Sequence, residues 1–283
     1  MRSVLLLVAV CFLAADAQAQ WLNYPTPGLP RTKEGQPILT APMPRTADGK
    51  PDLSGVWHVQ PTPLAEMKRL FGNDVDIVQV PGMEIETVSK YGINIFADFA
   101  PGAEPIRKEA AEEIRRRNQS ASGLDTLSRC LPATTPLATL LSEVTKIVQA
   151  PGITLVMHEL DNATRQIYTD GRPLPVSPNP SWLGYSAGRW DNDTLVVETS
   201  GFNDKAGLDI MGHPRSESMR ITERYTRRDV GHLDVEITFN DPVVYTTPFT
   251  VKVTHLLQAD TDILEYFCNE NEKDQTHLTA GNK

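Results

Sequence analysis

The sequence lacks the motifs that identify most cofactor-dependent enzymes. Its 283 residues contain no GxGxxG, no P-loop, no HExxH and no GxSxG, so the nucleotide-binding, zincin and α/β-hydrolase classes have no support. Only six histidines and three cysteines occur, and their spacing matches no metal cluster. We therefore expect neither a cofactor nor a metal.

After residue 19 the chain lacks any further long apolar run. Residues 4–15 are apolar, Arg2 precedes them and Ala17-Gln18-Ala19 follows, a pattern typical of a signal peptide over residues 1–19. The run is too short to span a bilayer as a stable helix, although an uncleaved anchor is the alternative. We expect a soluble mature protein, periplasmic or secreted, with no membrane insertion after cleavage.

An excess of basic residues is also missing. Lys and Arg number 27 against 36 Asp and Glu, a formal net charge of −9. Such an acidic chain argues against nucleic acid and against anionic membrane surfaces as partners. It is compatible with a neutral or apolar small-molecule ligand, and it leaves the oligomeric state open.

Cysteine is scarce in the mature chain. Cys11 lies in the signal, which leaves Cys130 and Cys268. In an oxidising compartment this number suggests one disulfide, which would close a loop of about 140 residues and contribute about 5 kcal/mol. Two buried free thiols are the alternative.

The order of composition along the chain predicts one domain. Residues 20–50 are rich in Pro, Gly and Thr and predict an extended arm. Residues 51–272 form the expected single β-rich domain, which starts with a turn into a strand anchored by Trp57. Helices are expected at 65–71 and 104–118, within a helical insertion near 104–145. Residues 273–283 form a tail.

From residue 153 the hydrophobic period becomes two. The stretch 184–203 reads as strand, tight turn and strand. Strands of this spacing predict a mainly β fold, an antiparallel calycin-like barrel or sandwich with an added helical segment. Eight strands are expected, at 153–160, 164–169, 185–190, 194–199, 218–227, 232–240, 249–257 and 262–268.

Four of these strands place an ionisable residue on an apolar face. Glu223 shares a face with Met219, Ile221 and Tyr225, and His255 lies among the apolar residues of 249–257. Glu159 is expected on the face of Ile153, Leu155 and Met157, and Glu265 between Ile263 and Phe267. An inward carboxylate costs several kcal/mol unless it is paired.

Two interpretations of the inward groups stay open. In one, Glu223 and His255 are a catalytic acid/base pair in a cavity. In the other, Glu223 neutralises a buried arginine, Arg165 or Arg172, and His255 is a structural core histidine.

Two loops add candidate site residues. Arg172, in an Asp-Gly-Arg-Pro turn, exposes a guanidinium suited to a carboxylate or an oxyanion. Together with Tyr185 it is expected to bind substrate, and Glu159 and His213 are further substrate-binding candidates. His213 and Glu217 could be two metal ligands, but the sequence shows no third.

The motifs together resemble a family of poorly characterised exported proteins, frequent in soil bacteria. The resemblance covers residues 50–272 and implies one exported domain in which Glu223, Arg224, Asp170, Arg172 and both mature cysteines are fixed features. It implies no reaction. The motifs are PDLSGVW at 51–57, CLP at 130–132, DGR at 170–172, GRWDNDTLVV at 188–197, TERY at 222–225, DP at 241–242, and Glu265 with CNEN at 268–271.

Three functions follow as hypotheses. The favoured one is a cofactor-independent small-molecule enzyme, a lyase/isomerase or a hydrolase, that works in a barrel cavity. The second is a periplasmic binding protein for an apolar or aromatic compound. The third is an interaction module of the envelope, which a filled barrel would favour.

Overall fold

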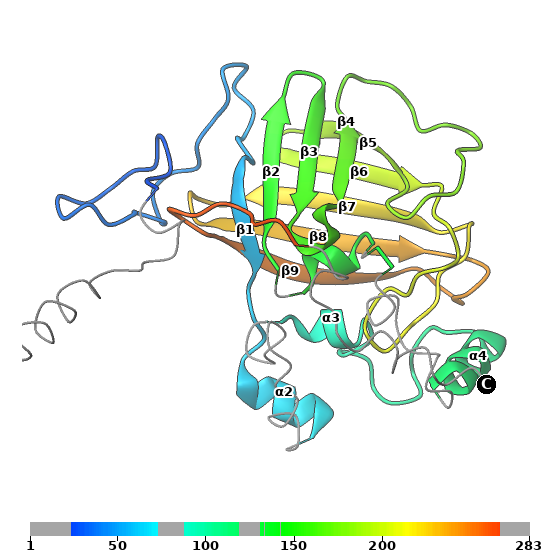
Figure 1. Cartoon of the computed structure of the whole chain (residues 1–283). Coiled ribbons are helices and arrows are strands. Elements are labelled where there is room, and N and C mark those ends of the chain that lie inside the picture. Colours follow the sequence, from blue (N-terminus) through cyan, green and yellow to red (C-terminus); the bar gives the residue numbers. More distant parts are fainter. Residues whose placement is uncertain (1–23, 73–87, 119–130, 133, 142, 267–283) are drawn as a thin grey trace, which may run out of the picture.

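The strands of the protein close into one barrel. A computed structural model describes residues 24–72, 88–118, 131–132, 134–141 and 143–266; the side chains of residues 116–118 lie outside this description. Nine strands pair in chain order, from β1 to β9, and β1 pairs with β9 to close the barrel (Figure 1). The strands are β1 Gly55–Val59, β2 Thr145–Ala150, β3 Ile153–His158, β4 Thr164–Tyr168, β5 Tyr185–Asp191, β6 Thr194–Ser200, β7 Arg220–Arg227, β8 His232–Asn240 and β9 Phe249–Leu257.

The expected mainly β barrel with a helical segment is confirmed. Seven of the eight expected strand ranges correspond to β3–β9, and the expected first strand is β1. The strand at 145–150 was not expected, because its short TKIVQA sequence falls at the end of the presumed helical insertion.

The strand expected at 262–268 is wrong. Residues 262–266 form no strand, and 267–268 lie outside the described residues. The reason is topological: β1 already pairs with both β2 and β9, so the closed barrel leaves no free edge for a further strand.

Eight of the nine strand pairs are antiparallel, and one differs. β4 and β5 are parallel, with Ile167 opposite Ser186, so their connection, residues 169–184, must cross back over the barrel wall. By contrast, β5 and β6 are joined by a tight turn in which Asn192 has φ 53°, a left-handed conformation that asparagine tolerates. The long crossover and the tight hairpin place the ends of β5 and β6 beside each other.

Alternate residues of the long strands fill the interior. Along β8 and β9 the buried and partly exposed positions alternate without interruption, as expected for a half-buried antiparallel sheet. Trp57 anchors one region of this core, donating from Nε1 to the Leu53 carbonyl over 3.0 Å. The guanidinium of Arg227 lies 4.8 Å from the Trp57 ring and donates to four backbone carbonyls.

The expected inward face of β3 is wrong. Thr154, Val156 and His158 are buried, whereas Ile153, Leu155 and Met157 are only partly buried. Val156 pairs across the sheet with two other buried residues, Ile147 and Arg165. Both faces of β3 carry apolar residues, so alternation alone did not determine which one faces inward.

The helices lie together at one side of the barrel (Figure 1). They are α2 Leu64–Phe71, α3 Lys90–Ile93 and α4 Lys108–Asn118, with short 3₁₀ turns η3 Leu137–Thr139 and η4 Leu160–Asn162. The two expected helices therefore exist, at α2 and α4. No helix in the described part of the chain is long and apolar enough to cross a membrane.

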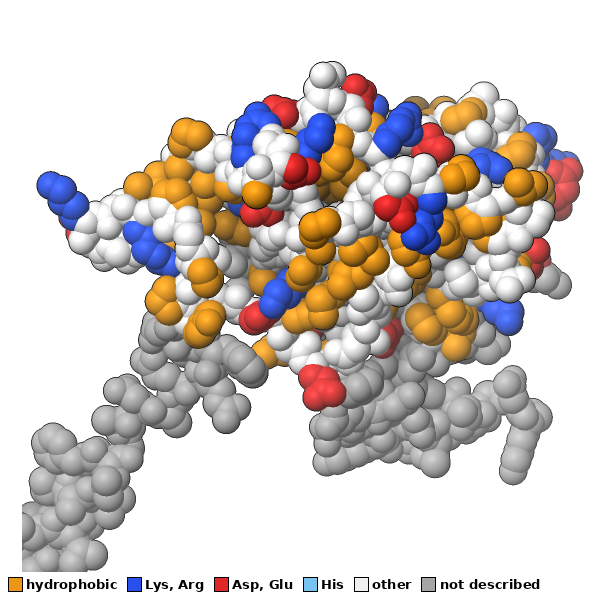
Figure 2. Space-filling model, turned by 90° about the horizontal axis from the view of Figure 1, so that it is seen from above, with side chains coloured by type: hydrophobic (Ala, Val, Ile, Leu, Met, Phe, Trp, Pro, Cys, Tyr) orange, Lys and Arg blue, Asp and Glu red, His pale blue; other side chains and the backbone are white. Residues whose placement is uncertain are grey.

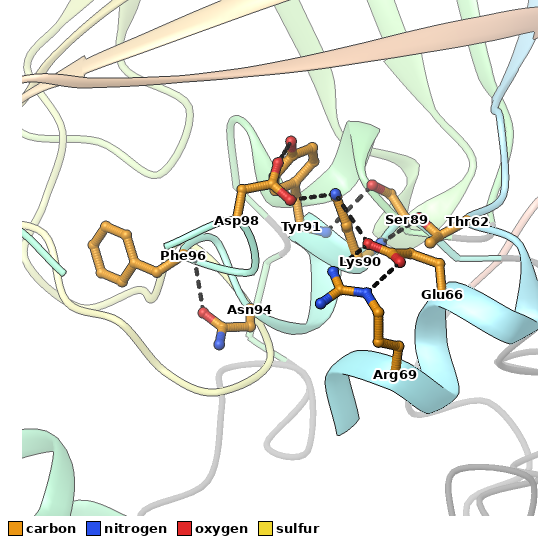
Figure 3. A network of polar contacts seen from close by, with 9 residues as sticks. All are labelled: Thr62, Glu66, Arg69, Ser89, Lys90, Tyr91, Asn94, Phe96 and Asp98. Atoms are coloured by element: carbon orange, nitrogen blue, oxygen red, sulfur yellow. Dashed lines mark hydrogen bonds and ion pairs between the residues drawn. The ribbon is translucent and has the colours of Figure 1, made fainter. Parts of the chain in front are cut away.

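A surface network fixes α3 against α2 (Figure 3). Lys90 forms an ion pair with Asp98 and lies 3.8 Å from Glu66, which also accepts two 2.7 Å bonds from Arg69. The Tyr91 hydroxyl donates to Asp98, and burial together with this bond raises the pKa of Tyr91 well above its usual range. Each of these charged groups has a partner within the network, so we assign the network a structural role.

The N-terminal segment of the described chain runs along the barrel without forming a helix or a strand. Arg31 pairs with Asp260 at one point, and Arg45 donates to Asp193 at 2.6 Å at another. The backbone of Leu39 accepts a 2.7 Å bond from Gly231. These contacts hold the segment against the barrel at three points.

Candidate functional site

Glu223 forms an ion pair with an arginine inside the barrel. Its carboxylate forms a bidentate pair with Arg165, including one 3.0 Å bond from Nη1, and both side chains are 1% exposed. The Tyr225 hydroxyl donates to the same carboxylate at 2.7 Å. Of the two arginines considered as partners of Glu223, the structure selects Arg165.

Arg165 is held on its other side by two hydroxyl groups. Its Nε donates to Ser186 at 2.9 Å and its Nη2 donates to Thr199 at 2.7 Å. Burial alone would lower the pKa of Arg165, but the charge and hydrogen bonds of Glu223 raise that pKa above its ordinary value. Arg165 therefore stays protonated, and its contacts with Glu223 have the geometry of a buried ion pair.

Two buried histidines lie elsewhere in the interior. The Nε2 of His255 lies 2.8 Å from the Thr139 carbonyl, and the Nδ1 of His158 lies 3.1 Å from the Thr145 hydroxyl. The remaining ring nitrogen of each has no hydrogen-bond partner among the described residues. Burial lowers the pKa of His255 to about 4 and that of His158 to about 3, so both imidazoles are neutral at pH 7.

The structure does not join Glu223 and His255. Within the described chain, the hydrogen bonds of Glu223 go to Arg165 and Tyr225, and that of His255 goes to Thr139. A catalytic role for the two residues stays a prediction. In the structure, each side chain already forms a hydrogen bond with another group of the protein.

The hollow beside His255 is small. Trp57, Val156, Tyr225 and Val235 contribute to its walls, and the centre of a water molecule has about 10 Å³ in which to move. This is the space that a single buried water needs. This hollow beside His255 is therefore too small for a metabolite-sized ligand.

Arg172 and Tyr185 do come together, on the outside of the barrel. The Arg172 guanidinium lies 4.0 Å from the Tyr168 ring centroid, and the rings of Tyr168 and Tyr185 stack with centroids 5.2 Å apart. Asp170 holds Arg172 through bonds of 2.6 and 2.9 Å. The guanidinium that was expected to bind substrate therefore already donates hydrogen bonds to the Asp170 carboxylate.

The other expected site residues lie apart from these. Glu159 accepts a 2.9 Å bond from the Leu264 backbone, and Glu265 is exposed. His213 Nδ1 lies 2.5 Å from Asp209, a buried carboxylate that also accepts a bond from the Ile95 backbone. No group of three or more His, Cys, Asp or Glu among the described residues could hold a metal ion. Cys130 and Cys268 lie outside the described residues, so the disulfide stays a prediction.

A larger hollow lies on the outside of the barrel wall. We call it the loop groove: its three sides are residues 176–180 of the β4–β5 crossover, residues 200–202 at the end of β6, and residues 217–220 at the start of β7. Its volume is about 300 Å³, at the lower end of the range for small-molecule sites. The loop groove is large enough for a metabolite-sized molecule. A second outer hollow, of about 420 Å³, is lined by Arg224, Asp234, Glu236 and Lys252, and each of these charged groups already forms an ion pair.

The floor of the loop groove is closely packed. Gly201 has φ +77°, and a Cβ there would lie 2.5 Å from the Pro178 ring, so the crossover packs directly on the end of β6. Phe202 is fully buried, and the Arg215 guanidinium lies 4.7 Å from its ring. Arg215 in turn donates to the Asn203 carbonyl at 2.8 Å, and burial lowers the pKa of Arg215 to about 10.

The loop groove also contains an unsatisfied polar group. Ser200 lines the groove and is 6% exposed, yet its hydroxyl has no hydrogen-bond partner among the described residues. Buried hydroxyls are normally bonded, to protein or to a bound molecule. The Oγ atom of Ser200 is itself enclosed, so the groove offers a closely packed floor and sufficient volume rather than an accessible hydroxyl.

Sequence reasoning missed the loop groove. Its three segments are 20 and 15 positions apart (180 to 200 and 202 to 217), and none carries a known motif. The available signals were the proline-rich run at 173–180 and Gly201 directly after a strand, both of which mark close backbone packing. Comparison with known proteins gives no support for any assignment, because no family, no curated protein and no solved structure matches the chain.

Proposed function

We propose that the protein binds a small molecule in the loop groove and performs no chemistry there. The observation that carries this proposal is a groove of about 300 Å³ on the outer barrel wall, where Pro178 packs directly on Gly201. Catalysis by Glu223 has less support, because a general base must be free to take a proton and Glu223 is bonded to Arg165.

One face of the protein carries charges of both signs. Acidic and basic side chains are scattered among apolar ones on the face seen in Figure 2. A nucleic-acid site would instead need a continuous basic patch. As expected from the net charge, we propose no nucleic-acid partner.

The test is a thermal-shift panel of amino acids, short peptides, sugars, short fatty acids and aromatic carboxylates. A ligand present at 100 times its Kd adds about 2.7 kcal/mol, which raises Tm by about 5–10 °C in a domain of this size. At least one class should stabilise the wild-type protein.

Ser218→Trp should abolish that stabilisation, because Ser218 is an exposed residue of the groove wall and an indole there fills the groove. The matched control is Thr250→Trp, at an exposed position of β9 remote in sequence from the groove segments, which should respond like the wild type. A shift that survives in Ser218→Trp would refute the location, and a panel without any stabilising class would refute the function.

A further inference from the structure

Two opposite charges line the loop groove without partners. Glu217 and Arg220 are both exposed residues of the groove wall. Neither forms an ion pair or a hydrogen bond with another side chain of the described residues, and the two do not pair with each other. This is unlike the nearby outer face of the sheet, where Arg189 pairs with Glu198 at 3.1 Å.

The outer face shows that pairing is the rule on this barrel. Arg224 pairs with Asp191 at 3.2 Å, and Lys252 pairs with Glu236 at 2.6 Å. An exposed ion pair forms at little cost, so two unpaired charges of opposite sign in one groove are left available for a ligand.

We propose that the ligand carries an amine cation and a carboxylate on one molecule, as a free amino acid or a short peptide does; this rests on the proposed function of the groove. The planar guanidinium of Arg220 matches a carboxylate in a bidentate geometry. The Glu217 carboxylate accepts hydrogen bonds from an ammonium group, which has three donors and no acceptor.

The remaining groups of the groove fit the middle of such a molecule. Pro178 and Pro180 provide apolar walls for an aliphatic side chain.

Other ligand classes leave part of this set unused. A phosphate would be repelled by Glu217, a fatty acid offers that carboxylate no cation, and a neutral sugar pairs with neither charge. Of these ligand classes, a zwitterion is the one whose two charges complement both Glu217 and Arg220.

The experiment is isothermal titration of the wild-type protein with Ala, Ala-Ala and Ala-Ala-Ala, and with the N-acetylated and C-amidated forms of the best binder. A charge-assisted hydrogen bond lost at one end weakens binding about tenfold. We therefore expect each cap to raise Kd by about that factor.

The variants assign each end of the ligand. In Glu217→Gln, N-acetylation should no longer change Kd, and in Arg220→Gln, C-amidation should no longer change it. The control is the double variant Arg189→Gln/Glu198→Gln, which removes an exposed pair of the same charges on the outer sheet face and should keep both tenfold effects. Because all four side chains are exposed, these variants should unfold within about 0.5 kcal/mol of the wild type.

Three results would overturn the inference. The first is binding that is insensitive to both caps, and the second is that the variants still discriminate the capped forms. The third is that none of the three lengths binds while another class of the thermal panel stabilises the wild type but not Ser218→Trp; this result rejects the zwitterion and leaves the groove as a binding site. If no class binds, the proposed function and this inference fail together.

Discussion

Replacing Glu223 by glutamine should strongly destabilise the protein. The substitution keeps the size of the side chain but removes the charge that neutralises Arg165, and both side chains are 1% exposed. The guanidinium would then be a buried cation whose remaining partners are two hydroxyl groups. Breaking a buried pair by removing one partner costs about 3–5 kcal/mol, and we expect a loss in this range.

The assay is urea unfolding at pH 7, followed by tryptophan fluorescence. Glu236→Gln is the matched control, because its partner Lys252 is 75% exposed and such surface pairs contribute less than about 1 kcal/mol. The double variant Arg165→Met/Glu223→Leu should recover most of the lost stability, since apolar replacement of a whole buried pair is often neutral.

A free energy of unfolding for Glu223→Gln within about 1 kcal/mol of the wild type would refute this reasoning. It would mean that Arg165 is neutralised by something other than Glu223. The catalytic hypothesis for Glu223 would then regain its place, because a residue that is not needed for folding is free to act on a substrate.

Two further predictions concern pH and redox state. His255 is neutral in the folded protein, with a pKa of about 4 against an ordinary 6.5, so its contribution to stability is complete above pH 6.5 and is lost as the pH falls toward 4. The free energy of unfolding should fall by about 3 kcal/mol over this range because of His255, and the buried His158 acts in the same direction. Unfolding measured at pH 7.5 and at pH 5 should show a clearly smaller pH dependence of stability in His255→Gln than in the wild type. An unchanged pH dependence would contradict the assignment. If Cys130 and Cys268 are joined, a reductant should lower Tm by several degrees, whereas an unchanged melting curve would argue for free thiols.

The barrel could be predicted from sequence because its long strands alternate cleanly. In the strand expected at 218–227, for example, the sequence placed Met219, Ile221, Glu223 and Tyr225 on one face, and all four are buried. Alternation also found β9 with His255 inside. What alternation cannot give is which strands pair, and the parallel contact of β4 with β5 is a property of the crossover rather than of either strand.

The candidate site could not be predicted for a related reason. The sequence pattern of an inward-facing carboxylate is the same whether the group is free for catalysis or paired. What distinguishes the two is the position of Arg165, which β4 places in the same barrel interior as Glu223. The loop groove depends on contacts such as Pro178 against Gly201, which join segments with no shared periodicity. Its unpaired charges, Glu217 and Arg220, become informative only once their lack of partners can be seen.

The central claim is that a small molecule binds in the loop groove rather than inside the barrel. Amide chemical shifts of the wild-type protein, recorded while adding the compound that stabilises it most in the thermal panel, test this directly. The account predicts that the largest shift changes fall on residues 177, 200–202 and 217–220. Changes concentrated around Trp57, Val235 and His255, which line the interior hollow, would contradict it and return the binding site to the barrel.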